Sequence, residues 1–156
     1  SLRRVLSGLW PFAEGAMEIP ARKETLFIPQ RPYMPMGTLK EAALYPGREG
    51  NLEELKGWMK ECGLSHWISH LDEEGDWGHV LSLGEQQKLA FVRIFMTKPR
   101  WVFLDEATSA MDEETENKLY SLLVTMPGIT VVSVGHRSTL DKYHTRTLQV
   151  REGTVV

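Results

Sequence analysis

The sequence predicts an α/β fold in which a largely parallel sheet carries an inserted helical subdomain. Short apolar segments of strand length alternate with segments in which apolar residues recur at helical spacing. The stretch 38–98, between two predicted strands, is almost purely helical, so we assign it to the subdomain and assign 1–37 and 99–156 to the sheet core. The 156 residues, with 42% hydrophobic and 25% charged side chains, match the composition of one globular domain.

The first part of the chain holds one predicted helix and one predicted strand. Residues 2–9 carry apolar side chains on one helical face, and Pro11 follows them. The stretch "ETLFI" at 24–28 is typical of a short buried strand, which Pro29 ends before a proline-rich loop. From 38 to 71 apolar residues repeat at helical spacing.

The second part of the chain alternates helices and strands. One helical register holds Leu89, Val92, Arg93 and Met96. The apolar run before Asp105 is typical of a buried strand. We predict a loop at 72–82, a helix at 84–96, a strand at 101–105 and a helix at 113–124. A strand at 129–134, a short helix at 138–142 and a final hairpin at 146–156 follow.

The composition narrows the classes of function. The net charge of −3 provides no basic field that would favour nucleic acid or anionic lipid. The single cysteine, Cys62, excludes an internal disulfide and a multi-cysteine zinc site, and it fits a reducing compartment. No apolar run approaches the roughly 18 residues of a membrane span, so we expect any membrane connection to run through another domain or a partner.

Polar side chains follow three predicted strands at the point where each strand ends. Asp105 and Glu106 come directly after the apolar run "VFL", and Gln30 and His136 each stand just past another strand. Each alone has an ordinary explanation, since acids can meet solvent at a sheet edge and a lone histidine is often a hydrogen-bonded structural residue. Because ligands bind outside the carboxyl ends of parallel strands, we expect these four residues to share one site. A cation and a phosphate chain there would supply the charge that the two acids lack.

The segment "LSLGEQQ" at 81–87 places a serine and a glycine directly before a helix start. The backbone N–H groups and the dipole of a helix N-terminus favour an anion such as phosphate. For this stretch alone, a simple N-cap by Ser82 is the better explanation.

In this order and with these spacings, "FIPQ", "LSLGEQQ", "VFLDEATSAMD" and "SVGHR" resemble the nucleotide-binding domain of an ABC transporter over essentially the whole chain. "DWGHVLSLGEQQ" and "SVGHRSTLDKYHTRTLQ" look most like the D-type half-transporters and their bacterial relatives. The resemblance implies a P-loop NTPase-like fold, with 1–156 forming part of the ATPase domain and the signature motif lying within 38–98. It also implies ATP and Mg²⁺ as cofactors.

The resemblance implies a role for each residue that matches a family motif. Glu106 would be the general base that orients the attacking water, and His136 would contact the γ-phosphate. Asp105 would hold Mg²⁺, and Gln30 would touch both the metal and the nucleotide. The resemblance implies that 81–85 is the signature motif and 109–112 the D-loop. The further residues implied to contact nucleotide, from these two segments, are Ser82, Gly84, Glu85 and Asp112. The signature would act on ATP held by the opposite subunit.

Departures from the family pattern limit what the resemblance implies. The 156 residues contain no G-x-x-x-x-G-K-[ST] phosphate loop, and the helix at 2–9 looks like the one that follows this loop in the family. We therefore expect further sequence before Ser1 in the natural protein, and we expect the chain alone to be inactive. Within the signature, Leu83 replaces the usual glycine and Glu85 the usual glutamine, whereas Gly84, which lets the backbone approach phosphate, is retained.

The implied function is ATP binding and hydrolysis coupled to transport, at the cytoplasmic face of a membrane. The implied partners are a transmembrane domain, which would dock near the loop 29–37 and the helices beyond it, and a second nucleotide-binding domain in a head-to-tail dimer. No nucleic acid is implied. The alternatives are a folded interaction module that binds no nucleotide, and a DNA-repair or chromosome ATPase. The latter typically has a coiled coil or a zinc insertion between Gln30 and the signature, and this chain has neither heptads nor cysteine clusters there.

Overall fold

The computed structural model describes residues 24–135, 142–144, 150–151 and 154–155. In chain order the elements are β1 (Thr25–Ile28), β2 (Gly37–Thr38), α2 (Leu39–Leu44), α3 (Leu52–Glu61), the 3₁₀ helix η2 (Ser65–His70), β3 (Glu74–Gly75), α4 (Trp77–Val80), α5 (Leu83–Thr97), β4 (Trp101–Asp105), α6 (Glu113–Val124), β5 (Thr130–Val134), β6 (Val150–Arg151) and β7 (Thr154–Val155). The predicted helix at 2–9 lies outside the described residues, as does most of the one at 138–142. Within the described part of the chain, no helix combines the length and the apolar character needed to cross a membrane.

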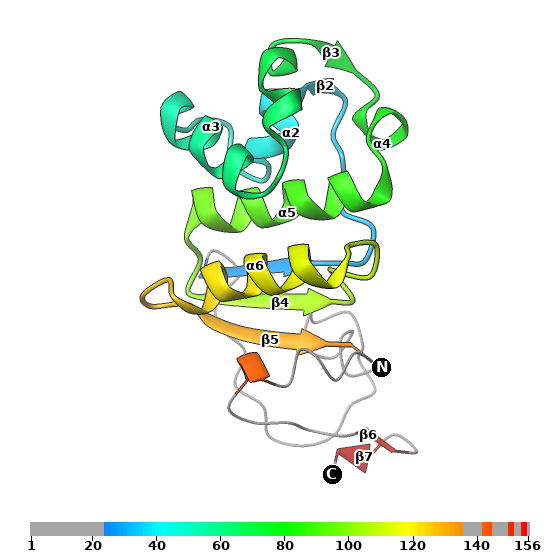
Figure 1. The fold of residues 1–156 in the computed structure, drawn as a ribbon, viewed down its shortest axis with the longest axis vertical. Helices are drawn as coiled ribbons and strands as arrows, with labels where there is room; N and C mark the ends of the chain where they lie inside the picture. Colours follow the sequence, from blue (N-terminus) through cyan, green and yellow to red (C-terminus); the bar gives the residue numbers. More distant parts are fainter. Residues whose placement is uncertain (1–23, 136–141, 145–149, 152–153, 156) are drawn as a thin grey trace.

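Within the described residues, three strands form a parallel sheet in the order β1-β4-β5 (Figure 1). β4 lies in the middle, and its residues Val102 and Leu104 are buried. A continuous apolar run on a central strand is typical of parallel sheets. The register pairs Ile28 with Leu104 and Asp105 with Val134, so the carboxyl ends of the three strands meet at one edge. This arrangement confirms the predicted parallel α/β sheet.

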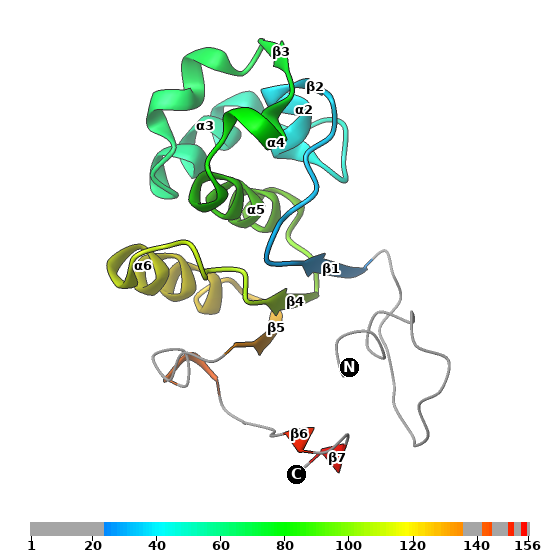
Figure 2. The ribbon, with the colours of Figure 1, turned by 90° about the vertical axis from the view of Figure 1, so that its right-hand side faces the viewer.

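The helices form layers around the sheet. α5 lies between the sheet and the block formed by α2 and α3, whereas α6 lies along one face of the sheet (Figures 1 and 2). Of residues 86–95 in α5, every one except Lys88 is buried, as expected for a helix enclosed on several sides. Trp58 of α3 stacks on Phe95 of α5 with their ring centroids 4.5 Å apart. Residues from the helical block, α5, the strands and α6 therefore join in one hydrophobic cluster.

Four helices begin at a residue whose side chain caps them. The capping residues Thr38, Asn51, Ser82 and Asp112 each accept a hydrogen bond from the backbone N–H three residues further on. These bonds satisfy N–H groups that have no partner within the helix, which explains why α2, α3, α5 and α6 start where they do. α5 ends at Thr97, and the C-cap residue Lys98 adopts the left-handed conformation with φ 48°.

The stretch 72–82, predicted as a loop, instead contains β3 and α4. β3 pairs with β2 in antiparallel orientation, with Gly37 opposite Gly75. Buried Trp77 donates from Nε1 to the carbonyl of Gly37 at 3.1 Å and fixes this pairing. Two-residue strands and a single helical turn are too short to leave a periodic pattern in a sequence, so sequence reasoning misses them. The predicted terminal hairpin is confirmed by the antiparallel pair β6–β7.

Candidate functional site

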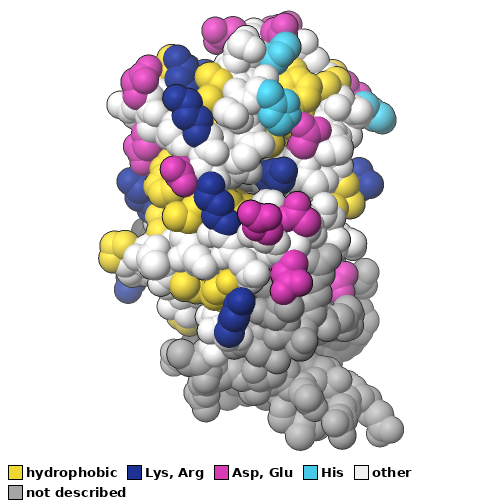
Figure 3. Space-filling view, in the orientation of Figure 1, with side chains coloured by type: hydrophobic (Ala, Val, Ile, Leu, Met, Phe, Trp, Pro, Cys, Tyr) yellow, Lys and Arg dark blue, Asp and Glu magenta, His cyan; other side chains and the backbone are white. Residues whose placement is uncertain are grey.

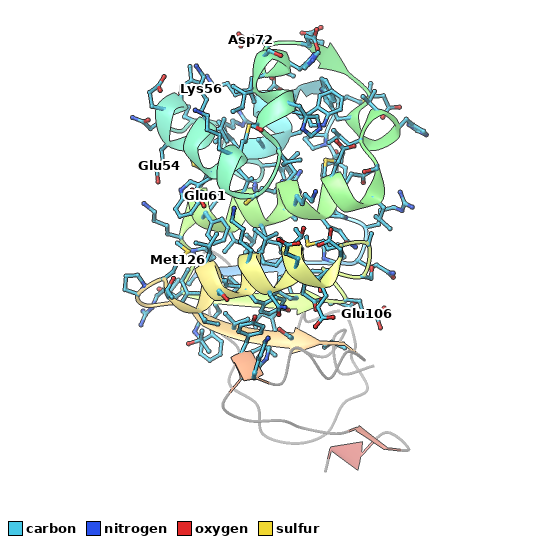
Figure 4. All side chains as sticks on the ribbon, in the orientation of Figure 1. Glu54, Lys56, Glu61, Asp72, Glu106 and Met126 are labelled. Atoms are coloured by element: carbon cyan, nitrogen blue, oxygen red, sulfur yellow. The ribbon has the colours of Figure 1, made fainter. Side chains whose placement is uncertain are left out.

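The carboxyl end of β4 carries the two adjacent acids. β4 ends at Asp105, and Glu106 adopts the left-handed conformation with φ 52°. The N–H of Glu106 donates to the carbonyl of Val134 at 2.8 Å, which holds this turn against β5. Adjacent side chains of a regular strand point to opposite faces, and the changed conformation at Glu106 releases the two carboxylates from that constraint. Figure 4 shows Glu106 at the end of the sheet toward which the arrows of β4 and β5 point.

Gln30 reaches the same edge from β1. It lies just beyond Ile28, the last residue of β1, and it is exposed. Its side-chain Nε2 donates to Ser109 Oγ at 3.1 Å. Ser109 belongs to the loop 106–112, which follows β4 and connects it to α6. Gln30 is therefore in direct contact with the loop that begins with Glu106.

The 106–112 loop is anchored to α6 through a buried polar contact. The Thr108 hydroxyl donates to the carboxylate of Glu116, and both residues are buried. Within the loop, the N–H of Ser109 donates to the Glu106 carbonyl at 3.2 Å, and the N–H of Met111 donates to the Thr108 carbonyl at 3.0 Å. A buried carboxylate is costly unless it is hydrogen-bonded. The loop therefore stays in a conformation in which the Thr108 hydroxyl reaches the Glu116 carboxylate.

Asp112 ends the loop and starts α6. Its Oδ1 accepts a hydrogen bond from the N–H of Thr115 at 2.7 Å. The hydrogen bonds from Thr115 lower the pKa of the Asp112 carboxyl, although the group is exposed. The side chain thus acts as an N-cap, and its predicted contact with nucleotide stays a prediction.

The N-terminus of α5 is closed by a reciprocal capping box. The N–H of Ser82 donates to Glu85 Oε1 at 3.0 Å, and the N–H of Glu85 donates to Ser82 Oγ at 3.2 Å. Glu85 also accepts from Trp67 Nε1, and His66 Nε2 lies 3.0 Å from its Oε2. Burial raises the pKa of the Glu85 carboxyl, but the hydrogen bonds from Trp67, Ser82 and His66 outweigh burial and lower it to about 2. Ser82 therefore has the capping role that the sequence left open.

Gly84 lies in the first turn of α5 and touches the 106–112 loop. A Cβ atom added at Gly84 would lie 2.9 Å from the carbonyl oxygen of Ala110. A separation this short requires the backbone of one segment to move, so a side chain does not fit here. The packing of Ala110 is therefore one reason for glycine at position 84. The predicted approach of the backbone to phosphate is a second, separate reason.

A family model described as "ABC transporter" matches residues 2–109. The chain belongs to the ABC transporter family. An uncharacterised ABC transporter ATP-binding protein of Haemophilus influenzae is 47% identical over 152 residues, which cover 96% of this chain and 26% of that relative. The lysosomal cobalamin transporter ABCD4 of Homo sapiens is 38% identical over 168 residues, covering 98% of this chain and 28% of that relative. The chain spans about a quarter of the length of these relatives.

A solved ABC structure shares the fold. A bacterial Atm1-family ABC exporter with ATP bound matches with a TM-score of 0.66 at 28% sequence identity, over 76% of this chain and 22% of that chain. This match confirms the predicted P-loop NTPase-like architecture. The predicted likeness to D-type half-transporters is confirmed by ABCD4 and by sub-family D member 3 of Rattus norvegicus, which is 40% identical over 92% of this chain and 23% of that relative.

The predicted site residues of this ABC-family chain lie in two groups. Those at the carboxyl edge of the sheet are Gln30, Asp105 and Glu106. Those at the start of α5 and of α6 are Ser82, Gly84, Glu85 and Asp112. The contact between Gly84 and the 106–112 loop joins the two groups. His136 lies outside the described residues, so its place in the site stays a prediction.

Sequence reasoning does not single out Gln87, which lies between the two groups. The side chain is 0% exposed. Its Nε2 donates to the Gln30 carbonyl at 2.8 Å and to Ser109 Oγ at 3.0 Å, and its Oε1 accepts from the N–H of Ala110 at 2.9 Å. The sequence could have marked Gln87 because it is an amide among the apolar side chains of α5, and a buried amide needs hydrogen-bond partners.

Arg93 is a second buried polar residue of α5 that the sequence does not mark as functional. Its Nε donates to the Ala42 carbonyl at 2.8 Å and its Nη2 to the Tyr33 carbonyl at 2.7 Å. The guanidinium lies 5.2 Å from the centre of the Tyr45 ring. Burial lowers the pKa of Arg93 to about 10. Arg93 therefore holds the segment that follows Gln30 against the end of α2.

The donor set at the sheet edge suits Mg²⁺. This ion prefers oxygen ligands, keeps several waters, and is usually bound by one or two carboxylates together with substrate phosphates. The Asp105 carboxylate and the Gln30 side-chain amide supply oxygens of this kind at one edge of the sheet. Among the described residues, no group of three or more His, Cys, Asp or Glu side chains is arranged to hold a metal ion by itself.

Proposed function

We propose that this chain is part of the ATP-binding and ATP-hydrolysing region of an ABC transporter, in which hydrolysis is coupled to transport across a membrane. The observation that carries the proposal is the pair Asp105 and Glu106 at the carboxyl end of the middle strand, with Gln30 at the same edge. Membership of the ABC transporter family supports it, as do relatives named as ATP-binding proteins of transporters.

In the proposed reaction, the side chains at the sheet edge position the reactants. ATP and Mg²⁺ are the cofactors, and the metal supplies positive charge against the charge of the phosphates. Asp105 holds the cation through its carboxylate, and Gln30 contacts both the cation and the nucleotide. Glu106 orients the attacking water and accepts its proton, so it is the general base. His136 contacts the γ-phosphate.

The proposed working unit is a head-to-tail dimer. The capping residues Ser82 and Asp112 are exposed, so the N-terminal turns of α5 and α6 can face a second domain. A helix N-terminus offers backbone N–H groups and a favourable dipole to an anion. We propose that Ser82, Gly84 and Glu85 contact the ATP that the second domain holds, and that Asp112 contributes from the 106–112 loop.

We propose that a transmembrane domain docks near the loop 29–37. Exposed apolar side chains support this position: Tyr33 is 61% exposed, Met36 70% and Tyr45 38%. The rings of Tyr33 and Tyr45 lie 5.1 Å apart, so they form a shared apolar surface. Through this partner the domain would lie at the cytoplasmic face of a membrane.

The proposal is tested by Glu106→Gln in the full-length protein. Because the amide cannot accept the proton of the attacking water, we expect ATP turnover to fall by about 10²–10⁴-fold. Binding of Mg-ATP and formation of the dimer should persist. Glu53→Gln, a change of the same kind at an exposed acid of α3, is the matched control and should leave turnover near its starting value. Near-normal turnover in Glu106→Gln would contradict the proposal.

A second candidate function is a folded interaction module that binds no nucleotide. The lack of a G-x-x-x-x-G-K-[ST] sequence favours it only for the 156 residues taken by themselves, because that loop supplies the N–H groups and the lysine that hold the β- and γ-phosphates. A DNA-repair role has less support. On the face shown in Figure 3, basic and acidic side chains are interspersed and form no continuous basic patch. The proposal therefore includes no nucleic acid.

A further inference from the structure

The Gln87 side chain connects three segments that are far apart in the sequence. From α5 it donates to the Gln30 carbonyl after β1 and to the Ser109 hydroxyl in the 106–112 loop, and it accepts from the N–H of Ala110. The Gln30 side chain also donates to the Ser109 hydroxyl. A hydroxyl oxygen has two lone pairs, so Ser109 can accept from both amides at once. Gln30, Gln87 and Ser109 therefore form a closed ring of contacts.

Burial makes this ring hard to open. Gln87 is 0% exposed, so water cannot replace a partner that moves away. A buried amide that loses its partners pays its full desolvation cost, and hydrogen bonds in such an environment are stronger than in water. Any displacement of Gln30 relative to Ala110 must break at least one of the Gln87 bonds, so the two segments move together.

Gly84 provides a second contact between α5 and the loop. Gly84 and Gln87 are three residues apart and so lie on the same face of the helix. The carbonyl of Ala110 packs against Gly84, while the N–H of Ala110 donates to Gln87. The backbone carbonyl and the backbone N–H of Ala110 are thus both held against the first turns of α5.

We propose that Gln87 is a positioning residue for ATP hydrolysis: it sets the place of Gln30 relative to the 106–112 loop and ties both to the signature helix α5. This inference rests on the proposed function. Because Gln87 is fully buried, it acts through Gln30 and the loop, and not on the nucleotide. Reacting groups must be held within a fraction of an ångström. Loss of Gln87 therefore lowers kcat more than it weakens binding of Mg-ATP.

The neighbouring glutamine offers a matched control. Gln86 is 2% exposed, and its Nε2 donates to the carbonyls of Gly78 and Leu81, each at 3.0 Å. Its substitution removes two side-chain hydrogen bonds, where that of Gln87 removes three, and neither of the two involves Gln30 or the 106–112 loop. In the full-length protein, Gln87→Leu should lower kcat by about tenfold or more with little change in KM for Mg-ATP. Gln86→Leu should lower the melting temperature by a similar amount but leave kcat near its starting value.

A double-mutant cycle separates positioning from general destabilisation. If Gln87 acts through Ser109, the kcat losses of Gln87→Leu and Ser109→Ala should not multiply, and the double variant should be little slower than Gln87→Leu alone. The same cycle with Gln86→Leu should show independent effects. Independent effects of Gln87 and Ser109, or equal kcat losses in the Gln86 and Gln87 variants, would overturn the inference.

Amide exchange gives a readout that does not depend on activity. In Gln87→Leu, the Ala110 N–H loses its acceptor, so peptides covering 107–112 should exchange faster than in Gln86→Leu. Unchanged exchange there would refute the positioning role even if the protein hydrolyses ATP. Faster exchange in a protein that binds and hydrolyses no ATP would instead mean that the proposed function is wrong while the structural coupling stands.

Discussion

Glu106 has a Cβ atom, yet it adopts φ 52°, a region that residues other than glycine rarely enter. This conformation costs about 1–2 kcal/mol. Three contacts sustain it: the hydrogen bond from its N–H to the Val134 carbonyl, the hydrogen bond from the Ser109 N–H to its own carbonyl, and the hydrogen bond from Thr108 to Glu116 of α6. The sequence places the two acids at the strand end, but no property of glutamate predicts a left-handed backbone. The conformation is imposed by the surroundings.

Glu85 makes the stability of the N-terminus of α5 depend on pH. Its folded-state pKa of about 2 lies below the ordinary value of 4.5. The ionised Glu85 carboxylate therefore contributes fully to the free energy of unfolding above pH 4.5. This contribution is lost as the pH falls toward 2, because protonation removes the charged acceptor. We expect the free energy of unfolding to fall by on the order of 3 kcal/mol across this window because of Glu85. Acid titration of unfolding by circular dichroism would measure it.

Glu85→Gln is the variant that isolates this effect. Glutamine can still close the capping box with Ser82 but has no charge to lose. The variant should be less stable than the unmodified chain at neutral pH and should lose less stability between pH 4.5 and 2. An identical acid dependence in both proteins would show that Glu85 does not control it.

At the scale of elements, periodicity and caps predict most of the long helices and the strands. α5 follows from its apolar register, and the parallel pairing of β1, β4 and β5 follows from the alternation of strands and helices. Sequence reasoning does not show what buried polar residues bind: Arg93 shares the predicted register of α5 and no pattern singles out Gln87, but the hydrogen-bond partners of both come only from the structure. It also fails at β3 and α4, which are set by tertiary contacts of Trp77 and not by any local pattern.

Two helical glycines should respond in opposite ways to alanine. In an exposed helix interior, Gly→Ala stabilises by about 0.5–1 kcal/mol because the unfolded chain loses freedom. Gly57 in α3 has nothing within 4 Å of an added Cβ, so Gly57→Ala should show this gain. At Gly84 the added Cβ would meet the Ala110 carbonyl at 2.9 Å, and Gly84→Ala should instead destabilise by about 1–3 kcal/mol. Urea unfolding of both variants decides it; a gain at Gly84 would mean that the loop yields easily.

At the scale of the whole molecule, the helical block and the sheet are joined mainly through α5. An ion pair also links α3 to α6, the helix along the sheet: Lys118 Nζ lies 3.7 Å from Glu61 Oε2. The two side chains are 54% and 53% exposed, so water and salt screen the pair and it adds little. The apolar surface of α5, with Phe91 and Phe95 fully buried, therefore supplies most of the connection.

The whole-molecule prediction concerns nucleotide affinity. The 156 residues contain no G-x-x-x-x-G-K-[ST] sequence, the loop that supplies a row of N–H groups and a lysine to the β- and γ-phosphates. Made alone, this polypeptide should bind Mg-ATP weakly or not at all and should show no ATPase, whereas the full-length protein should do both. Titration calorimetry on the two proteins tests this. Micromolar binding by the 156 residues alone would show that the loop is dispensable for affinity.

The strand order β1-β4-β5 also has a consequence for how the chain folds. Thr25 pairs with Trp101, so the first ladder of the sheet joins strands about 75 residues apart in the sequence, and closing so long a flexible loop would cost about 4 kcal/mol of entropy. The cost falls if the intervening helices form first, because they bring the two ends together. We therefore expect the helical block to acquire protected amides before β1 does, in a pulse-labelled refolding experiment. The helices between β1 and β4 would then form the surface on which the first strand of the sheet is added.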